Sequence, residues 1–258
     1  MNGYLLTVLG AAAMALTPAP SQLRPPAHGV GIGDYTLHDF AAKWLMQQDD
    51  IAEIGHFAAA NQALAPEPAG RMRIVQFGDS ITAHWDLSAH DTAKRHFVNR
   101  GIGGQNSSQM VLRFESDVVA LHPQIVVILA GTNDLRAYVG DPASVGTSAL
   151  ARISRNLTAM ADMAKANHIG VVLSLIPPVG TDRERIARDQ ASIDQINDWI
   201  RTFARLRHLS VVDYPSALAD DRGAMPDSYS QDGIHPNAAG YAVMWPKLEA
   251  AIAGLAVQ

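Results

Sequence analysis

A serine, an aspartate and a histidine are the residues of this chain whose types and spacing could together perform chemistry. Ser80 lies in the segment Gly78-Asp79-Ser80, whereas Asp232 and His235 lie near the other end of the chain. A serine hydroxyl is a weak nucleophile unless a base lies beside it, and an imidazole that titrates near neutral pH can be that base. Because Asp232 precedes His235 by three residues, a single turn could aim its carboxylate at the ring and hold the required tautomer.

Strand-like and helical segments alternate along the chain and must position these residues. Short apolar runs typical of buried strands occupy Met72–Phe77, Phe97–Asn99, Gln124–Ala130, Gly170–Ile176 and Ser210–Asp213. Helical patterns lie near Thr36–Leu64, Ser107–Leu121, Gly146–Asn167, Arg185–Leu206 and Asn237–Ala253. This alternation predicts a parallel sheet covered by helices on both faces.

The segments that carry the candidate catalytic residues all follow predicted strands. They are Gly78–Thr82, Asn99–Gly104, Gly131–Asp134 and, beyond the last strand, Asp232–Pro236. Ligands of open parallel sheets bind in the crevice at the carboxyl ends of the strands. We therefore expect these four segments to meet at one edge of the sheet, although they are far apart in sequence.

The four segments resemble the sequence blocks of the SGNH, or GDSL-type, hydrolases. That family has a Gly-Asp-Ser near the start, a glycine in a small loop, a Gly-x-Asn-Asp and an Asp-x-x-His near the end. All four blocks occur here in that order, and the resemblance covers about residues 70–255. It extends to the flanking segments His122–Asp134 and His235–Tyr241. The Gly-x-Ser-x-Gly pattern of α/β-hydrolases is absent around Ser80, which argues against that different fold.

The resemblance implies both a fold and an activity. The fold would be a three-layer α/β/α sandwich with a five-stranded parallel sheet of flavodoxin-like strand order 2-1-3-4-5. The activity would be carboxyl-ester hydrolysis by Ser80, Asp232 and His235, with neither a cofactor nor a metal. The oxyanion hole would comprise the backbone N–H groups of Ser80 and Gly104 and the side-chain amide of Asn133. Gly103 is the alternative to Gly104, because the choice depends on a one-residue alignment of the glycine loop.

Each of these residues also has a structural interpretation. Ser80 could cap the helix that follows the first strand, and Asn133 could simply form a turn. We expect Asp79 and Asp134 to organise loops rather than to catalyse. His84 and Trp85 could line an acyl pocket or belong to a packed helix face. Arg100 could contact substrate or hold its own loop.

Composition limits the other classes of function. The chain has 258 residues, of which 48% are hydrophobic, so a sizeable core is expected. The net charge is -5 and no basic stripe is present, which argues against a nucleic-acid partner. There is no cysteine, which excludes disulfides, thiolate metal sites and a cysteine nucleophile.

The N-terminal region predicts export. The apolar run Tyr4–Leu16 is short for a membrane span but suits the core of a signal peptide, although no Lys or Arg precedes it. We therefore predict a signal peptide over residues 1–19, a linker over residues 20–35 and a hydrolase domain over residues 36–258. The localisation would be secreted or periplasmic, without a membrane span. The alternative is that the apolar run is a buried or frayed N-terminal segment.

The substrate is less sharply defined than the mechanism. The loops around Ala137–Ser148 and Thr181–Asp189 look short and polar, which favours a short acyl group, such as acetyl on a carbohydrate. A lysophospholipase or thioesterase of the same fold is the first alternative. A non-catalytic carbohydrate-binding module is the second, and intact Ser80, Asn133, Asp232 and His235 argue against it.

Overall fold

A five-stranded parallel sheet forms the centre of the protein, as seen in a computed structural model that describes residues 49–136, 142–181 and 188–255. The strand order is β2-β1-β3-β4-β5, which confirms the predicted order. The strands are β1 (Met72–Gly78), β2 (Arg95–Gly101), β3 (Ile125–Leu129), β4 (Gly170–Ser174) and β5 (Ser210–Val212). All five residues of β3 are buried, as a central strand covered on both faces requires.

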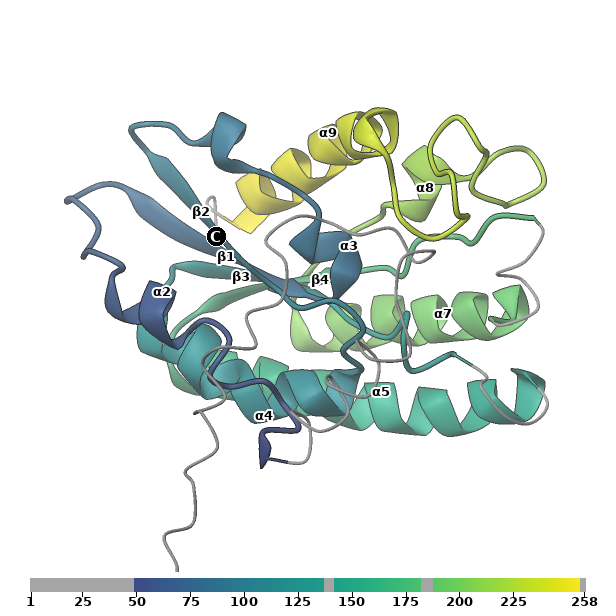
Figure 1. Ribbon diagram of the computed structural model, residues 1–258, viewed down its shortest axis with the longest axis horizontal. Coiled ribbons are helices and arrows are strands. Elements are labelled where there is room, and N and C mark those ends of the chain that lie inside the picture. The colour runs from purple at the N-terminus through teal and green to yellow at the C-terminus, as the bar shows by residue number, and fades with distance from the viewer. Residues whose placement is uncertain (1–48, 137–141, 182–187, 256–258) are drawn as a thin grey trace, which may run out of the picture.

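Helices cover both faces of the sheet and complete the predicted three-layer sandwich (Figure 1). One face carries α4 (Ser107–Asp117), α5 (Pro142–Ala166) and α7 (Gln190–Arg207). The other carries α3 (Ser80–Ala83), α8 (Pro215–Leu218) and α9 (Ala238–Leu255). The short elements are α2 (Ala58–Gln62), η3 (Ser88–His90) and η4 (Val119–Leu121). Each face of the sheet buries its own apolar cluster, so the side chains of β1 alternate between two cores.

The strand register brings the chemically interesting segments to one edge. Gly78, the last residue of β1, pairs with Gly101 at the end of β2 and with Leu129 at the end of β3. The loops that follow these three strands therefore leave the sheet side by side. This arrangement is the one expected from the positions of the motifs.

The predicted helix over Thr36–Leu64 is wrong in its described part. Turns occupy most of residues 51–57, and of the described residues in this range only Asp49 and Ala58–Gln62 are helical, whereas residues 36–48 lie outside the described range. Ile51 is 60% exposed and Ile54 is 44% exposed, so these apolar residues do not form the buried face that would stabilise a longer helix.

Other predicted boundaries shift by a few residues. α5 begins at Pro142 rather than Gly146. The described part of the predicted loop Ala137–Ser148, which is residues 142–148, is therefore helical. α7 begins at Gln190 rather than Arg185, because the Asp189 side chain caps it by accepting from the N–H of Ser192. β2 is longer than Phe97–Asn99, because all seven of its residues pair with β1.

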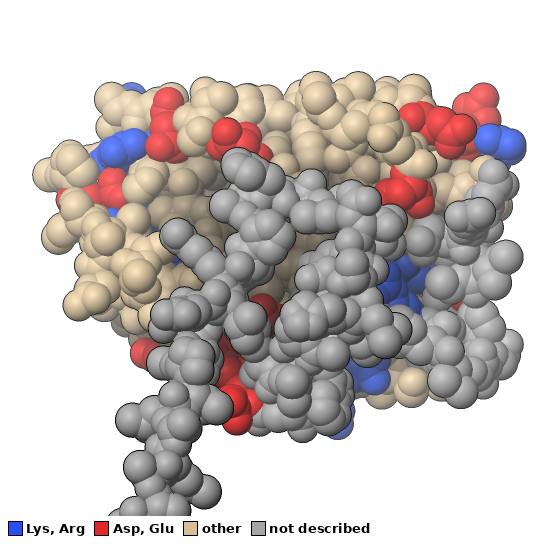
Figure 2. Space-filling model, viewed as in Figure 1, with Lys and Arg blue, Asp and Glu red and all other residues tan. Residues whose placement is uncertain are grey.

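The structure leaves the prediction of export untested. Residues 1–35, which hold the predicted signal peptide and linker, lie outside the described range. Among the described residues, no helix has the length and apolar character needed to cross a membrane. On the face shown in Figure 2, the visible basic and acidic side chains lie in several separate places.

Candidate active site

Ser80 is the first residue of α3 and follows β1 after a single intervening residue, Asp79. The helix is capped by Asp79, whose carboxylate accepts from the N–H of Ile81 at 3.0 Å. Asp79, and not Ser80, therefore caps α3. Asp79 is fully buried, and it organises this turn as predicted.

Two glycines allow α3 to lie directly against the strand ends. A Cβ atom on Gly78 would lie 2.1 Å from Oγ1 of Thr82, and one on Gly101 would lie 2.2 Å from the backbone nitrogen of Ala83. Neither position has room for a side chain. The close approach presses the start of α3, and with it Ser80, against the ends of β1 and β2.

His235 connects Ser80 to Asp232. Its Nε2 atom lies 2.8 Å from the Ser80 hydroxyl oxygen, and its Nδ1 atom lies 2.6 Å from a carboxylate oxygen of Asp232. The fold thus brings together all three residues whose spacing suggested a triad. The His235 side chain is 19% exposed, so solvent and small molecules can approach the site.

The turn around Gly233 holds the Asp232 carboxylate in place. The second carboxylate oxygen accepts from the backbone N–H groups of Ile234 at 2.9 Å and His235 at 2.8 Å. Gly233 has a φ of 76°, a left-handed conformation that glycine adopts without strain. Burial by itself would raise the pKa of Asp232, but the hydrogen bonds from His235 and Ile234 outweigh it and hold this pKa far below its usual range.

Asn133 lies in the loop after β3 and is held by two neighbours. Its side-chain nitrogen donates to the backbone oxygen of Gln105 at 3.0 Å, and its side-chain oxygen accepts from Arg188 at 3.5 Å. Arg188 is buried and also donates to the backbone oxygen of Thr132 at 2.9 Å. No sequence motif marks Arg188, which lies within the predicted helix Arg185–Leu206.

The glycine loop after β2 lies beside Ser80. A Cβ atom on Gly103 would be 3.8 Å from the Cβ of Ser80, and Gly104 has a left-handed φ of 81°. Both glycines thus belong to the turn next to the serine. The assignment of Gly104, rather than Gly103, as an oxyanion donor stays a prediction.

Asp134 connects the Asn133 loop to the start of α4. Its carboxylate accepts from the backbone N–H of Ser107 at 2.8 Å, from the Ser107 hydroxyl at 2.7 Å and from Arg152 at 2.9 Å. Asp134 therefore organises its loop, as predicted.

The structure also separates the alternatives for His84, Trp85 and Arg100. The His84 ring is exposed, and its centroid lies 5.2 Å from that of His235. Trp85 is buried and stacks on Tyr241, so it belongs mainly to a packed face. The Tyr241 hydroxyl donates to the backbone oxygen of Ile81 at 2.8 Å and so connects α9 to α3.

Arg100 is buried and donates to the side-chain oxygen of Asn61 and to the backbone oxygen of Asn99, so it holds its own part of the structure.

Asp79 should make stability depend on pH. Burial raises its pKa to about 6. At pH values between the ordinary pKa of an aspartate and about 6, the folded protein keeps a proton on Asp79 that the unfolded chain loses. The free energy of unfolding therefore falls as the pH rises through this range. Asp79→Asn keeps an oxygen that can cap α3 but cannot ionise. We expect it to be more stable than the wild type by about 3 kcal/mol above pH 7, and nearly equal to it below pH 4.

Urea unfolding of both proteins, measured once above pH 7 and once below pH 4, gives this difference in the free energy of unfolding. Asp86→Asn is the matched control, because Asp86 is exposed and hydrogen bonding to Ser88 lowers its pKa instead. Its replacement should give a small change of the opposite sign. A stability difference for Asp79→Asn that does not vary with pH would contradict the prediction.

The arrangement defines a class of protein. Serine hydrolases activate their nucleophile by a serine hydroxyl that is hydrogen-bonded to an imidazole, which is hydrogen-bonded in turn to a carboxylate. Here it lies at the carboxyl edge of a parallel sheet in a three-layer fold. Within the described parts of the chain, no group of three or more His, Asp or Glu side chains is placed to hold a metal ion.

Comparison with known proteins gives the family. Residues 77–243 match the model of the GDSL-like lipase/acylhydrolase family, and the chain belongs to that family. A Bacteroides fragilis protein named as an acylhydrolase has 31% identity and a TM-score of 0.69, over 80% of this chain and 98% of that one. A GDSL-like lipase of Bacteroides thetaiotaomicron has 32% identity and a TM-score of 0.67, over 79% and 98%.

More distant matches extend the likeness of the fold. An acetylxylan esterase of Geobacillus stearothermophilus shares 20% identity and a TM-score of 0.59, over 72% of this chain and 96% of that one. Matches to two curated relatives span only 34% and 38% of the lengths of those proteins.

Proposed function

We propose that the protein is a serine esterase that hydrolyses carboxyl esters through an acyl-enzyme. The observation that carries this proposal is the hydrogen-bonded chain from Ser80 through His235 to Asp232, with distances of 2.8 Å and 2.6 Å. A serine within hydrogen-bond reach of a base, which is itself oriented by a third group, has the geometry of an activated nucleophile.

The reaction would proceed in two steps. The Ser80 oxygen attacks the acyl carbonyl carbon while Nε2 of His235 takes the hydroxyl proton. The tetrahedral intermediate collapses, the bond to the alcohol breaks, and His235 gives the proton to the departing oxygen. Water then attacks the acyl-enzyme by the same route and releases the acid and free Ser80. Asp232 keeps the proton of His235 on Nδ1 and stabilises the imidazolium.

The oxyanion would be stabilised by three donors. The backbone N–H groups of Ser80 and Gly104 form part of the proposed hole. The side-chain nitrogen of Asn133 has two N–H groups, one of which donates to Gln105, and the other would serve the oxyanion. Each such donor typically contributes about 3–4 kcal/mol to transition-state stabilisation.

The substrate we propose is a short-acyl ester, such as an acetyl ester, of a carbohydrate. A cavity of about 530 Å³ is lined by His84, whose ring lies beside His235, and by Phe57, Gln76 and Asn99 among other residues. The amide nitrogen of Gln76, which lines this cavity, is buried and has no hydrogen-bond partner among the described residues, so a small movement of this side chain would let it donate to a sugar hydroxyl. The fold shared with an acetylxylan esterase adds a reason to test such substrates.

Activity on p-nitrophenyl acetate and butyrate should exceed that on the octanoate and decanoate in kcat/KM. Acetylated xylan should be hydrolysed, whereas lysophospholipid and acyl thioesters should be poor substrates. Gln76→Leu should raise the KM for an acetylated xylo-oligosaccharide and leave that for p-nitrophenyl acetate unchanged, because only the sugar reaches this amide. A kcat/KM profile that peaks at octanoate or longer esters would instead favour the lysophospholipase or thioesterase alternative.

A further inference from the structure

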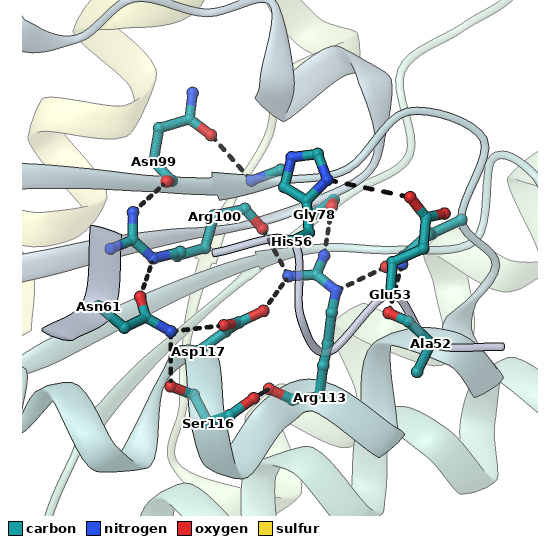
Figure 3. Close-up of polar contacts among 12 residues, drawn as sticks. Ala52, Glu53, His56, Asn61, Gly78, Asn99, Arg100, Arg113, Ser116 and Asp117 are labelled. Atoms are coloured by element: carbon teal, nitrogen blue, oxygen red, sulfur yellow. Dashed lines mark hydrogen bonds and ion pairs between the residues drawn. The ribbon is translucent and has the colours of Figure 1, made fainter. Parts of the chain in front are cut away.

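A buried arginine ties together the two strand ends that carry the proposed site (Figure 3). Arg113 of α4 is fully buried. Its guanidinium donates to the backbone oxygen of Gly78 at 3.0 Å and to that of Arg100 at 2.9 Å, and it pairs with Asp117 at 3.1 Å. Gly78 lies two residues before Ser80, and Arg100 lies directly before the glycine loop. The five N–H donors of a guanidinium allow one side chain to hold both strand ends.

Gln105 joins this network to the proposed oxyanion hole. It directly follows Gly104, and only 1% of it is exposed. Its side-chain oxygen accepts from Nε of Arg113 at 2.6 Å, and its side-chain nitrogen donates to the backbone oxygen of Ala52 at 2.8 Å. Its own backbone oxygen accepts from the Asn133 side chain at 3.0 Å. One residue thus contacts the strand-end arginine, the N-terminal segment and the side chain proposed as an oxyanion donor.

The N-terminal segment formed by residues 50–62 lies outside the part of the chain that matches the family model. Side chains attach it to the domain at several points. Gln109 donates to the backbone oxygen of Ile51 at 2.8 Å, Asn61 donates to Asp117 at 2.8 Å, and Arg100 donates to Asn61 at 2.7 Å. This segment is therefore attached to Gln105, to α4 and to the end of β2, and Figure 3 shows Ala52 and Asn61 on either side of Arg113.

We infer that Gln105 is a positioning residue, which holds the Gly104 backbone and the Asn133 side chain in register for oxyanion binding and is itself held by residues 50–62. The inference rests on the proposed esterase function. Its chemical basis is that an amide can accept from Arg113 and donate to Ala52 at the same time. A carboxylate at this position could accept from Arg113 but could not donate to the Ala52 carbonyl. The contact with the N-terminal segment therefore requires the amide.

Loss of this contact should impair the transition state more than the ground state. Oxyanion donors act only when they are held close to the productive geometry, within about 0.5 Å. A misplacement of about 1 Å can cost on the order of 100-fold in rate. Substrate binding uses other contacts, so KM should change little.

Gln105→Glu tests the inference, because it keeps the acceptor for Arg113 and removes the donor to Ala52. With p-nitrophenyl acetate we expect kcat to fall about 10- to 100-fold, with KM changed less than about twofold. The affinity of an alkyl boronic acid, which forms a tetrahedral adduct on Ser80, should fall by the same factor as kcat/KM. Gln105→Met removes both bonds without adding a charge, so it should show the same loss even if the glutamate variant fails to fold.

Gln109→Glu is the matched control. Gln109 also donates to a carbonyl of the N-terminal segment, and its oxygen accepts from the N–H of Asn106, which a glutamate would preserve. It should lower the melting temperature as Gln105→Glu does but leave kcat and boronate affinity unchanged. If the role of Gln105 were purely structural, Gln105→Glu would likewise lower the melting temperature and leave kcat and boronate affinity unchanged.

The inference is overturned if a folded Gln105 variant keeps the wild-type kcat, if its boronate affinity does not follow kcat/KM, or if Gln109→Glu loses as much activity. Failure of the proposed function would look different. The wild-type protein would then neither hydrolyse p-nitrophenyl acetate nor react with a fluorophosphonate at Ser80.

Discussion

Ser80→Ala should lower kcat for p-nitrophenyl acetate by a factor on the order of 10⁵–10⁶, the scale seen when a triad serine is removed from a protease. The variant lacks the oxygen that would form the acyl-enzyme and the hydroxyl that lies 2.8 Å from Nε2 of His235. Residual activity would come from water attacking the ester within the oxyanion hole. The fold should be retained, because Asp79 rather than Ser80 caps α3.

Steady-state rates and labelling by a fluorophosphonate give the measurement for Ser80→Ala. The reagent should modify the wild type at Ser80 and leave the variant unmodified, because reaction requires an activated serine. Ser154→Ala is the matched control, since that hydroxyl donates to the local backbone oxygen of Ala151 on α5. It should keep wild-type rates and labelling. Wild-type rates in a folded Ser80→Ala variant would refute the proposed mechanism.

Asp232→Asn should lower kcat by roughly 10⁴-fold, as expected when the carboxylate of a triad becomes an amide. The backbone N–H groups of Ile234 and His235 donate to one carboxylate oxygen. An asparagine would keep its oxygen there, so its NH₂ group would face Nδ1 of His235. That nitrogen would then have to accept, which places the ring proton on Nε2. In this tautomer the imidazole cannot take the Ser80 proton.

Rates measured between pH 6 and pH 9 test this second prediction. The pKa of Asp232 lies far below this range, so the wild-type carboxylate is ionised throughout and the loss should persist at every pH. Asp198→Asn is the control, because Asp198 is exposed on α7 and pairs with Arg201 at the surface. Its rates should match the wild type. A loss of less than about tenfold for Asp232→Asn would show that this residue does not set the tautomer of His235.

The sequence predicted those features of the fold that depend on local patterns. Continuous apolar runs such as Gln124–Ala130 marked the strands, and their alternation with helices indicated a parallel sheet. The motifs lie directly after the strand ends, so their meeting at one edge could also be expected. Patterns of this kind are local, because the side-chain period of an element is set by its own backbone geometry.

Expectations based on local periodicity were wrong where packing did not support them. The helical pattern before Leu64 ends in turns over residues 51–57, because Ile51 and Ile54 are not buried there. Hydrogen bonds from Gln105 and Gln109 to this segment take the place of an apolar helix face. No periodic pattern encodes such contacts.

By itself, the sequence determined the family resemblance, the layered fold and the residues able to perform the chemistry. The tertiary structure decided which of those residues touch and what holds them. Examples are the contact of Ser80 with His235, the hydrogen bond between Arg188 and Asn133, and the burial of Arg113 against the ends of β1 and β2. The physical reason is that contacts between distant residues depend on strand register and on helix packing over the whole domain. A buried polar side chain such as Arg113 or Gln105 acquires its partners only when those elements are assembled around it.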